Sequence, residues 1–216
     1  MIRSLCLALL LTANLFADYP RKTAVVEAVA KTKDAIVMLK VTKEKGTSCG
    51  TGVIINNQGF VVTNYHVVVD GQKILATIRG EEVEAEILYT ASKRDLALLK
   101  LKKDKNWQHM EIGNSSDVMV GETVIAIGNP YGYDNTVSIG IVSAKERKIQ
   151  GPKGNPMSDM IQHSAGINPG CSGGPLLNIN GELIGLNTAT REGAQGISFA
   201  ISADTLKKVT TSLCSR

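Results

Sequence analysis

The feature of the sequence that most constrains the fold is a long alternation of short apolar runs with turn residues. The runs form two sets, from about residue 35 to 104 and from about 118 to 203, with about six runs in each. Examples are "GTGVIIN", "KILATI" and "DLALLKL" in the first set, and "TVIAIG", "ELIGLNTA" and "GISFAIS" in the second. Their length of roughly four to eight residues is typical of β-strands. The polar stretch "KKDKNWQHMEIGNSSD" between the sets indicates a connection.

We predict an all-β fold of two six-stranded antiparallel β-barrels, because the runs do not alternate with helical segments. The tetrapeptide "NNQG" at 56–59 predicts a hairpin turn, since Asn and Gly tolerate the backbone angles that such turns need. Apolar residues at helical spacing occur near the two ends, in "TAVVEAVAKT" and "ADTLKKVTTSL". We therefore expect a short N-terminal helix and a closing C-terminal helix.

The first 17 residues have the layout of a secretory signal peptide. Arg3 supplies an early positive charge, an apolar stretch covers Leu5 to Leu11, and the small residue Ala17 precedes polar sequence. The stretch is interrupted from Thr12 onward, well short of the roughly 20 apolar residues that a membrane-spanning helix needs. We expect a signal peptide at 1–17 and a mature domain at 18–216. That domain is expected to be periplasmic or secreted, without stable membrane insertion.

The charged residues are scattered along the chain. The sequence has 24 Lys and Arg against 20 Asp and Glu, and neither sign collects in one block. This distribution is typical of a solvated surface, so we expect no nucleic-acid partner.

The cysteines and histidines give little support for a metal site. Removal of the signal peptide takes away Cys6 and leaves Cys49, Cys171 and Cys214. Three cysteines in an oxidising compartment can form one disulfide with one free thiol, or stay as three separate thiols. No Cys-x-x-Cys occurs and the three histidines are far apart, so we expect no metal and no cofactor.

The segment "NPGCSGGPL" places two candidate nucleophiles, Cys171 and Ser172, next to each other. Gly170 to Gly174 also match the Gly-x-Ser-x-Gly pattern of α/β-hydrolases, but in those enzymes the histidine follows the serine. No histidine follows Ser172, whereas His66 and Asp95 precede it. The order His, Asp, Ser is that of chymotrypsin-like proteases.

The local sequences around His66 and Asp95 agree with this order. His66 lies in "TNYHVV", at the end of a strongly apolar run, and Asp95 opens the apolar strand "DLALLKL". An Asp at the head of a buried strand is costly without a partner. A histidine that acts as a general base is such a partner, because the carboxylate fixes its tautomer.

Several ordered segments resemble the protease domain of the HtrA (Deg) family of chymotrypsin-fold serine endopeptidases. They are "TNYHVV", "DLALLKL", "AIGNPYGYDNTVSIGIVSA", "INPGCSGGPLLNINGELIGLNTA" and "GISFAIS", and the resemblance covers roughly residues 25 to 210. It implies that His66 is the general base and acid, that Asp95 orients it and that Ser172 is the nucleophile. It also implies an oxyanion hole formed by the N–H groups of Gly170 and Ser172.

The same resemblance implies how substrate is bound. Ile167 would form the floor of the primary specificity pocket, and the strand Leu186, Asn187, Thr188 and Ala189 would pair with the substrate backbone. An aliphatic floor cannot stabilise a buried basic side chain, so we expect cleavage after small or medium apolar residues.

The sequence departs from the family pattern at a few positions. Cys171 replaces the usual Asn before the nucleophile, and His163 begins "HSA" where the family commonly has Thr-Asp-Ala. We expect His163 to be a tuning or surface residue, not a second base. In the chymotrypsin fold the strand matching "SCGTGVII" runs beside the nucleophile loop, so the resemblance suggests a disulfide between Cys49 and Cys171. We expect a protease domain alone, without the PDZ domain found in many members.

The sequence thus predicts a serine endopeptidase that cleaves unfolded or extended protein and peptide segments through an acyl-enzyme. Two alternatives stay open at this point. One is a non-catalytic chaperone or binding protein on the same scaffold, and the other is an esterase without proteolytic activity. The resemblance also allows a homo-oligomer.

Overall fold

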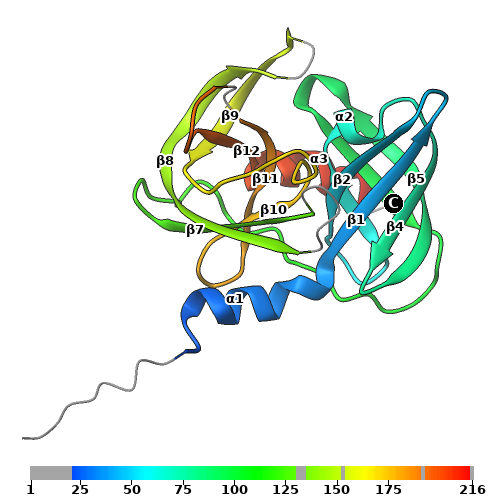
Figure 1. The fold of residues 1–216 in the computed structure, drawn as a ribbon, viewed down its shortest axis with the longest axis horizontal. Coiled ribbons are helices and arrows are strands. Elements are labelled where there is room, and N and C mark those ends of the chain that lie inside the picture. Colours follow the sequence, from blue (N-terminus) through cyan, green and yellow to red (C-terminus); the bar gives the residue numbers. More distant parts are fainter. Residues whose placement is uncertain (1–20, 130–134, 152–153, 191–192, 215–216) are drawn as a thin grey trace, which may run out of the picture.

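The computed structural model describes residues 21–129, 135–151, 154–190 and 193–214, and two β-barrels lie side by side in it (Figure 1). The first barrel is closed in the order β1-β2-β3-β6-β5-β4, with antiparallel neighbours throughout. Its strands are β1 (Ile36–Lys43), β2 (Thr47–Ile54), β3 (Phe60–Thr63), β4 (Gly71–Ile78), β5 (Glu81–Ala91) and β6 (Leu96–Leu101).

The second barrel is closed in the order β10-β11-β12-β9-β8-β7 and is also antiparallel. Its strands are β7 (Thr123–Gly128), β8 (Thr136–Gln150), β9 (Pro156–His163), β10 (Pro175–Leu177), β11 (Leu183–Thr190) and β12 (Ser198–Ser202). The prediction of two six-stranded antiparallel barrels is therefore confirmed.

Strand alternation gives the second barrel two apolar faces. On β7, Val124 and Ala126 belong to a cluster inside this barrel, whereas Ile125 and Ile127 belong to the large core that also contains the first barrel's residues. Successive side chains of a strand point to opposite faces, so β7 is buried and apolar on both of its faces. The contact between the barrels is thus an apolar core, which holds residues at its rim in a fixed relation.

Helix α1 (Ala24–Thr32) precedes β1 of the first barrel in the chain and lies against the second barrel (Figure 1). Its N-cap Thr23 accepts a hydrogen bond from Val26 N, as expected for a helix start. The buried Ala28 packs against Gly181 in the turn between β10 and β11, where an added Cβ would lie 3.4 Å from Ala28 Cα. The predicted N-terminal helix is confirmed.

Helix α3 (Ala203–Cys214) closes the chain, also as predicted. The hydroxyl of Ser202 accepts a hydrogen bond from Thr205 N and caps its first turn. Leu206 and Val209 insert into the core between the barrels. The hairpin at 56–59 is also confirmed, because Asn56 Oδ1 accepts from the N–H groups of Gln58 and Phe60.

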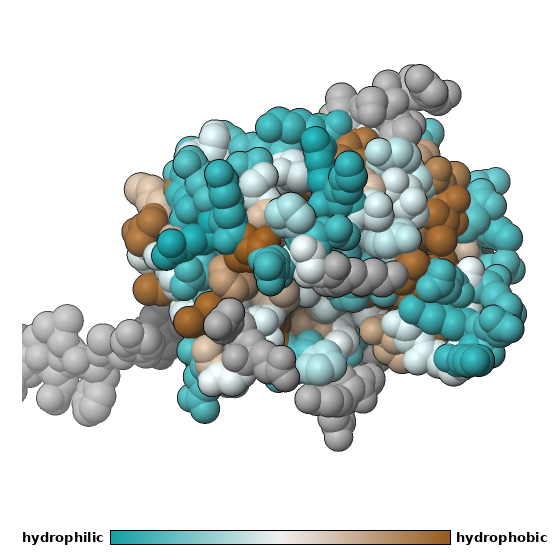
Figure 2. All heavy atoms as spheres, turned by 90° about the horizontal axis from the view of Figure 1, so that it is seen from above, coloured by the Kyte–Doolittle hydropathy of each residue, from teal (hydrophilic) through white to brown (hydrophobic). Residues whose placement is uncertain are grey.

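The surface seen in Figure 2 is mostly hydrophilic, with apolar side chains in several separate patches. One exposed apolar row follows alternate positions of β8, at Val137, Ile139 and Ile141. Within the described residues, no helix has the length and apolar character needed to cross a membrane. The predicted signal peptide at 1–17 lies outside the described residues.

Candidate active site

His66 stands at the rim of the first barrel, on a single helical turn. This turn, α2 (Tyr65–Val68), follows β3 directly, and its Val67 and Val68 are buried against the barrel. The apolar anchors leave the His66 side chain 28% exposed at the surface between the barrels. Its Nδ1 lies 2.8 Å from Asp95 Oδ2. Nδ1 is thus occupied, and in the described part of the chain Nε2 has no hydrogen-bond partner.

Asp95 is held in a left-handed backbone conformation, with φ 51°, after the 3-10 turn η2 (Ser92–Arg94). A non-glycine residue pays a steric cost in this region, but here the conformation turns the 3%-exposed carboxylate toward His66. Its Oδ1 accepts from His66 N at 3.0 Å, and its Oδ2 also accepts from Thr188 Oγ1 at 2.7 Å. The Asp95 carbonyl accepts from Tyr65 N and Asn64 Nδ2, both at 3.1 Å. These bonds fix the carboxylate and the His66 turn as one unit.

Ser172 lies on the tight turn between β9 and β10, at the facing rim of the second barrel. Its hydroxyl is partly exposed and donates a 3.5 Å hydrogen bond to Thr188 O. No hydrogen bond joins Ser172 to His66 in the described part of the chain. Hydrogen bonds of this kind are often long or unmade in a free enzyme and form with bound substrate.

The backbone of the turn leaves two N–H groups unused. In the part of the chain that the structure describes, Gly170 N and Ser172 N donate to no protein acceptor, whereas Cys171 N donates to Asn168 O at 2.9 Å. Gly170 has φ 101°, a conformation that an L side chain rarely adopts. Two free donors flanking an occupied one can bind an oxyanion.

Thr51, a residue outside the predicted set, holds this turn against the first barrel through two hydrogen bonds. Thr51 N donates to Ser172 O at 2.8 Å, and Thr51 Oγ1 donates to Gly170 O at 2.7 Å. At Gly173, an added Cβ would lie only 2.1 Å from Thr51 O, so no other residue fits there. Sequence reasoning missed Thr51, although its place between two glycines inside a strand, "GTG", is a signal of close backbone approach.

Cys171 is buried beside the turn and does not share the setting of Ser172. Its side chain belongs to the apolar cluster inside the second barrel, and its Sγ lies against Gly128, where an added Cβ would be 2.9 Å away. Burial raises the pKa of the Cys171 thiol, an effect partly opposed by a backbone hydrogen bond at Asn168. A buried neutral thiol is a poor nucleophile.

The predicted disulfide between Cys49 and Cys171 is wrong, because both are free cysteines in the structure. The reason is strand alternation on β2. Gly50 faces the nucleophile turn, with an added Cβ 3.3 Å from Ser172 O, so the neighbouring Cys49 points the opposite way and is exposed.

Only part of the strand predicted to bind substrate has backbone groups free to pair with a substrate. Leu186 pairs with Pro175 on one side and with Ile201 on the other. Asn187 is also occupied, because its N–H donates to Gly174 O and its carbonyl accepts from Gly173 N. The prediction that these two residues pair with substrate is therefore wrong; they hold the nucleophile turn instead.

The C-terminal end of β11 differs from its start in strand pairing. Pairing with β10 stops at Leu186, so among the described strands Ala189 and Thr190 pair with β12 alone, and Thr188 lies at the register shift between Asn187 and Ala189. A hollow of about 800 Å³ adjoins this end, lined by Lys148, Ile149, Gln150, Ala189, Thr190, Gly193 and Phe199. An open strand edge beside a hollow suits an extended peptide.

Ile167 is 9% exposed and lies in the same apolar cluster as Ala165 and Cys171. It precedes the nucleophile turn in the chain. Within the described residues, no group of His, Cys, Asp and Glu side chains is arranged to hold a metal ion.

His163 is fully buried at the end of β9, so the alternative of a surface residue is wrong. Among the described residues, neither ring nitrogen has a hydrogen-bond partner, and the same is true of the Oδ1 atom of the buried Asn187. Burial lowers the pKa of His163 to about 4, and the side chain of Asn187 opposes this shift in part. The imidazole is therefore neutral at pH 7. It lies beside Asn187, whose backbone is hydrogen-bonded to Gly173 and Gly174 of the nucleophile turn.

The two-barrel fold, with a His–Asp pair on one rim and a serine turn with free N–H groups on the other, defines the chymotrypsin-like class of fold. A family model described as "Trypsin-like peptidase domain" matches residues 50–186. The chain belongs to this family, and within it to the HtrA-type proteases, as the following relatives indicate.

Three similar proteins illustrate the relationship. The "Probable periplasmic serine endoprotease DegP-like" of Chlamydia trachomatis is 45% identical over 170 residues, covering 77% of this chain and 34% of that protein. The "Putative serine protease HhoA" of Synechocystis is 42% identical over 167 residues, covering 76% of this chain and 42% of that protein. The solved structure "HtrA-type protease AlgW with tripeptide" is 37% identical, with a TM-score of 0.82, covering 89% of this chain and 64% of that chain. The chain thus spans less than half the length of these two curated relatives.

Proposed function

We propose that this protein is a serine endopeptidase that uses Ser172 as nucleophile, His66 as general base and acid, and Asp95 to orient His66. The observation that carries the proposal is the pair of hydrogen bonds, at 3.0 and 2.8 Å, that the Asp95 carboxylate accepts from His66, facing a serine turn with two N–H groups that are free within the described residues. The membership of the family adds to it.

Acylation follows from these contacts. With Nδ1 held by Asp95, Nε2 of His66 is the free position and can take the proton from Ser172 Oγ as that oxygen attacks the substrate carbonyl. The carbonyl oxygen gains negative charge, which the N–H groups of Gly170 and Ser172 stabilise. His66 then gives its proton to the leaving amine and the peptide bond breaks.

Deacylation repeats these roles with water. His66 accepts a proton from the water that attacks the acyl-enzyme, and then returns a proton to Ser172 Oγ as the acid product leaves. Asp95 stabilises the imidazolium in both steps.

The substrates we propose are unfolded or extended protein segments. The edge at Thr188, Ala189 and Thr190 would add the substrate as a further strand. Ile167 would form the floor of the primary pocket and favour aliphatic residues before the cut. In keeping with the names of relatives such as the DegP-like protein, we propose a signal peptide at 1–17, a protease domain at 18–216 and a periplasmic or secreted location.

The test is cleavage of casein by the purified wild type and by Ser172→Ala. The wild type is expected to cut casein into fragments, and Ser172→Ala is expected to leave it intact with an unchanged circular dichroism spectrum. A wild type that binds casein without cutting it would instead support a chaperone or binding protein. Turnover of small esters with casein left intact would support an esterase.

A further inference from the structure

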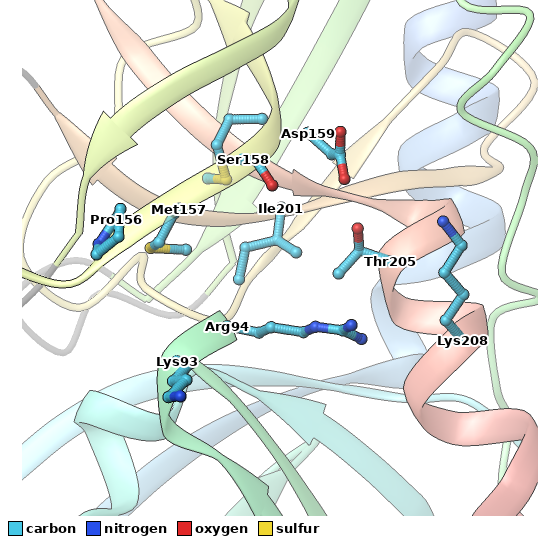
Figure 3. Close-up of a pocket in the computed structure, with 10 residues that line it drawn as sticks. Lys93, Arg94, Pro156, Met157, Ser158, Asp159, Ile201, Thr205 and Lys208 are labelled. Atoms are coloured by element: carbon cyan, nitrogen blue, oxygen red, sulfur yellow. The ribbon is translucent and has the colours of Figure 1, made fainter.

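A second cavity, of about 260 Å³, opens between the barrels and lies outside the set of residues proposed for catalysis (Figure 3). Both barrels contribute to it, with Lys93 and Arg94 of η2 on one side and residues of β9, β12 and α3 on the other. Its lining consists of Lys93, Arg94, Pro156, Met157, Ser158, Asp159, Met160, Ile201, Thr205 and Lys208.

The cavity has an excess of positive charge. Three cations, Lys93, Arg94 and Lys208, line it against one carboxylate, Asp159. Within the described residues, none of these four side chains forms an ion pair. Cations placed together without a counter-ion repel each other, and an anion bound between them would relieve this repulsion.

The arrangement of the side chains suits one small ligand. In Figure 3 the Arg94 side chain extends beneath Ile201 toward the Lys208 side chain, and the Thr205 hydroxyl lies above it. The buried side chains of Ile201 and Met157 form an apolar part of the lining, beside the exposed charged residues. Sites for drug-sized molecules usually exceed about 300 Å³, so this volume favours a smaller one.

The geometry points to a binding site for a small multivalent anion, recognised through a phosphate or carboxylate group by Arg94 and Lys208. The guanidinium of Arg94 can form two parallel hydrogen bonds to either group, and Lys208 adds a point charge from α3. Since Arg94 is followed directly by Asp95, such a ligand would also hold η2, in which Asp95 N donates to Ser92 O at 3.2 Å. Binding itself does not depend on the proposed protease activity.

The test is calorimetric titration of the full chain with inorganic phosphate and, separately, with citrate, at constant ionic strength. We expect saturable binding at one site per chain for at least one of them, and the comparison shows whether phosphate or carboxylate is recognised. The double variant Arg94→Gln, Lys208→Gln is expected to weaken binding at least about tenfold. If neither anion binds the wild type, the site does not exist.

Two further variants separate this site from a general effect of charge. Lys40→Gln with Lys45→Gln removes the same two charges from exposed positions of the β1–β2 hairpin, outside the cavity, and is expected to leave affinity unchanged. Asp159→Asn removes the one repulsive carboxylate and is expected to tighten binding. Equal losses in both double variants, or no gain from Asp159→Asn, would overturn the proposal.

The position of the ligand can be read from amide hydrogen exchange. Exchange at residues 92–96 is expected to slow in the wild type when the bound anion is present, and not in Arg94→Gln, Lys208→Gln. Saturable binding that leaves this segment unprotected would place the anion elsewhere and contradict the assignment.

Discussion

Thr188 Oγ1 donates a 2.7 Å hydrogen bond to Asp95 Oδ2, so a side chain of the second barrel holds the carboxylate of the first. Asp95 is 3% exposed and Thr188 is 5% exposed, and this bond therefore forms away from water. Hydrogen bonds to buried charged groups are stronger than neutral ones. The relative position of the barrels and the orientation of His66 are thus linked through one hydroxyl group.

The first prediction follows from this bond. Thr188→Val keeps the shape of the side chain but removes the donor, and kcat/KM for a peptide substrate is expected to fall about 10- to 100-fold, corresponding to about 1.5 to 3 kcal/mol. Thr188→Ser restores the hydroxyl and is expected to recover most of the activity. A Thr188→Val enzyme as active as wild type would show that the bond has no role in orienting Asp95.

The second prediction concerns the choice between the neighbouring side chains at 171 and 172. Ser172→Ala is expected to lower turnover on the order of a millionfold, because the members of a triad act as a unit. Cys171→Ala is expected to stay within about tenfold of wild type, since the thiol is buried and packs against Gly128. Rates of casein cleavage measure both, and an inactive Cys171→Ala with an active Ser172→Ala would reverse the assignment.

The third prediction concerns specificity. If Ile167 forms the floor of the primary pocket, the wild type is expected to cut after Val, Ala, Leu or Ile. Ile167→Asp supplies a buried negative charge and is expected to shift preference toward Lys or Arg. The cleavage sites in casein, mapped by mass spectrometry, measure this preference. A wild-type profile dominated by Lys and Arg would show that Ile167 is not the floor.

The fourth prediction is a pH dependence of stability that originates at His163. Its pKa is lowered to about 4 in the folded chain, against about 6.5 in an unfolded chain. Between these values the unfolded state binds more protons, so the stabilising contribution is complete above pH 6.5 and is lost as the pH falls toward 4. The loss between pH 7 and pH 4 is about 3 kcal/mol.

Urea unfolding across this pH range measures the effect. His163→Leu is expected to flatten the dependence relative to wild type, whatever its effect on stability at pH 7. His109→Gln is the matched control, because His109 is exposed, and it is expected to leave the dependence unchanged. A wild type and a His163→Leu variant with parallel stability profiles would contradict the burial of a neutral imidazole.

The barrels could be predicted because most of their strands contain a short apolar run and are separated by recognisable turns. His66, Asp95 and Ser172 could be singled out because they follow one another in the chain order of chymotrypsin-like proteases, with Ser172 in a glycine-rich turn. Contacts between segments far apart in the sequence were harder to predict. The orientation of Cys49 depends on which face of β2 meets the nucleophile turn, and the sequence does not reveal that register.

The role of Asn187 was also missed for a physical reason. Its backbone is bonded to Gly173 and Gly174, and its Nδ2 donates to Pro175 O at 2.9 Å. Nothing in "GLNTA" distinguishes a strand that binds substrate from one that holds the nucleophile turn. The difference arises only when β10 and β11 pair and leave Thr188 as the first residue with a free edge.

The central claim is that Ser172 is activated by His66, and covalent labelling with a fluorophosphonate tests it most directly. The reagent modifies a serine that has a working base, independently of any choice of substrate. We expect one label per wild-type chain, located on Ser172 by peptide mass mapping, and a labelling rate at least about a thousandfold lower in His66→Ala. A folded wild type that stays unlabelled, or a label on Ser172 that forms equally fast in His66→Ala, would contradict the account.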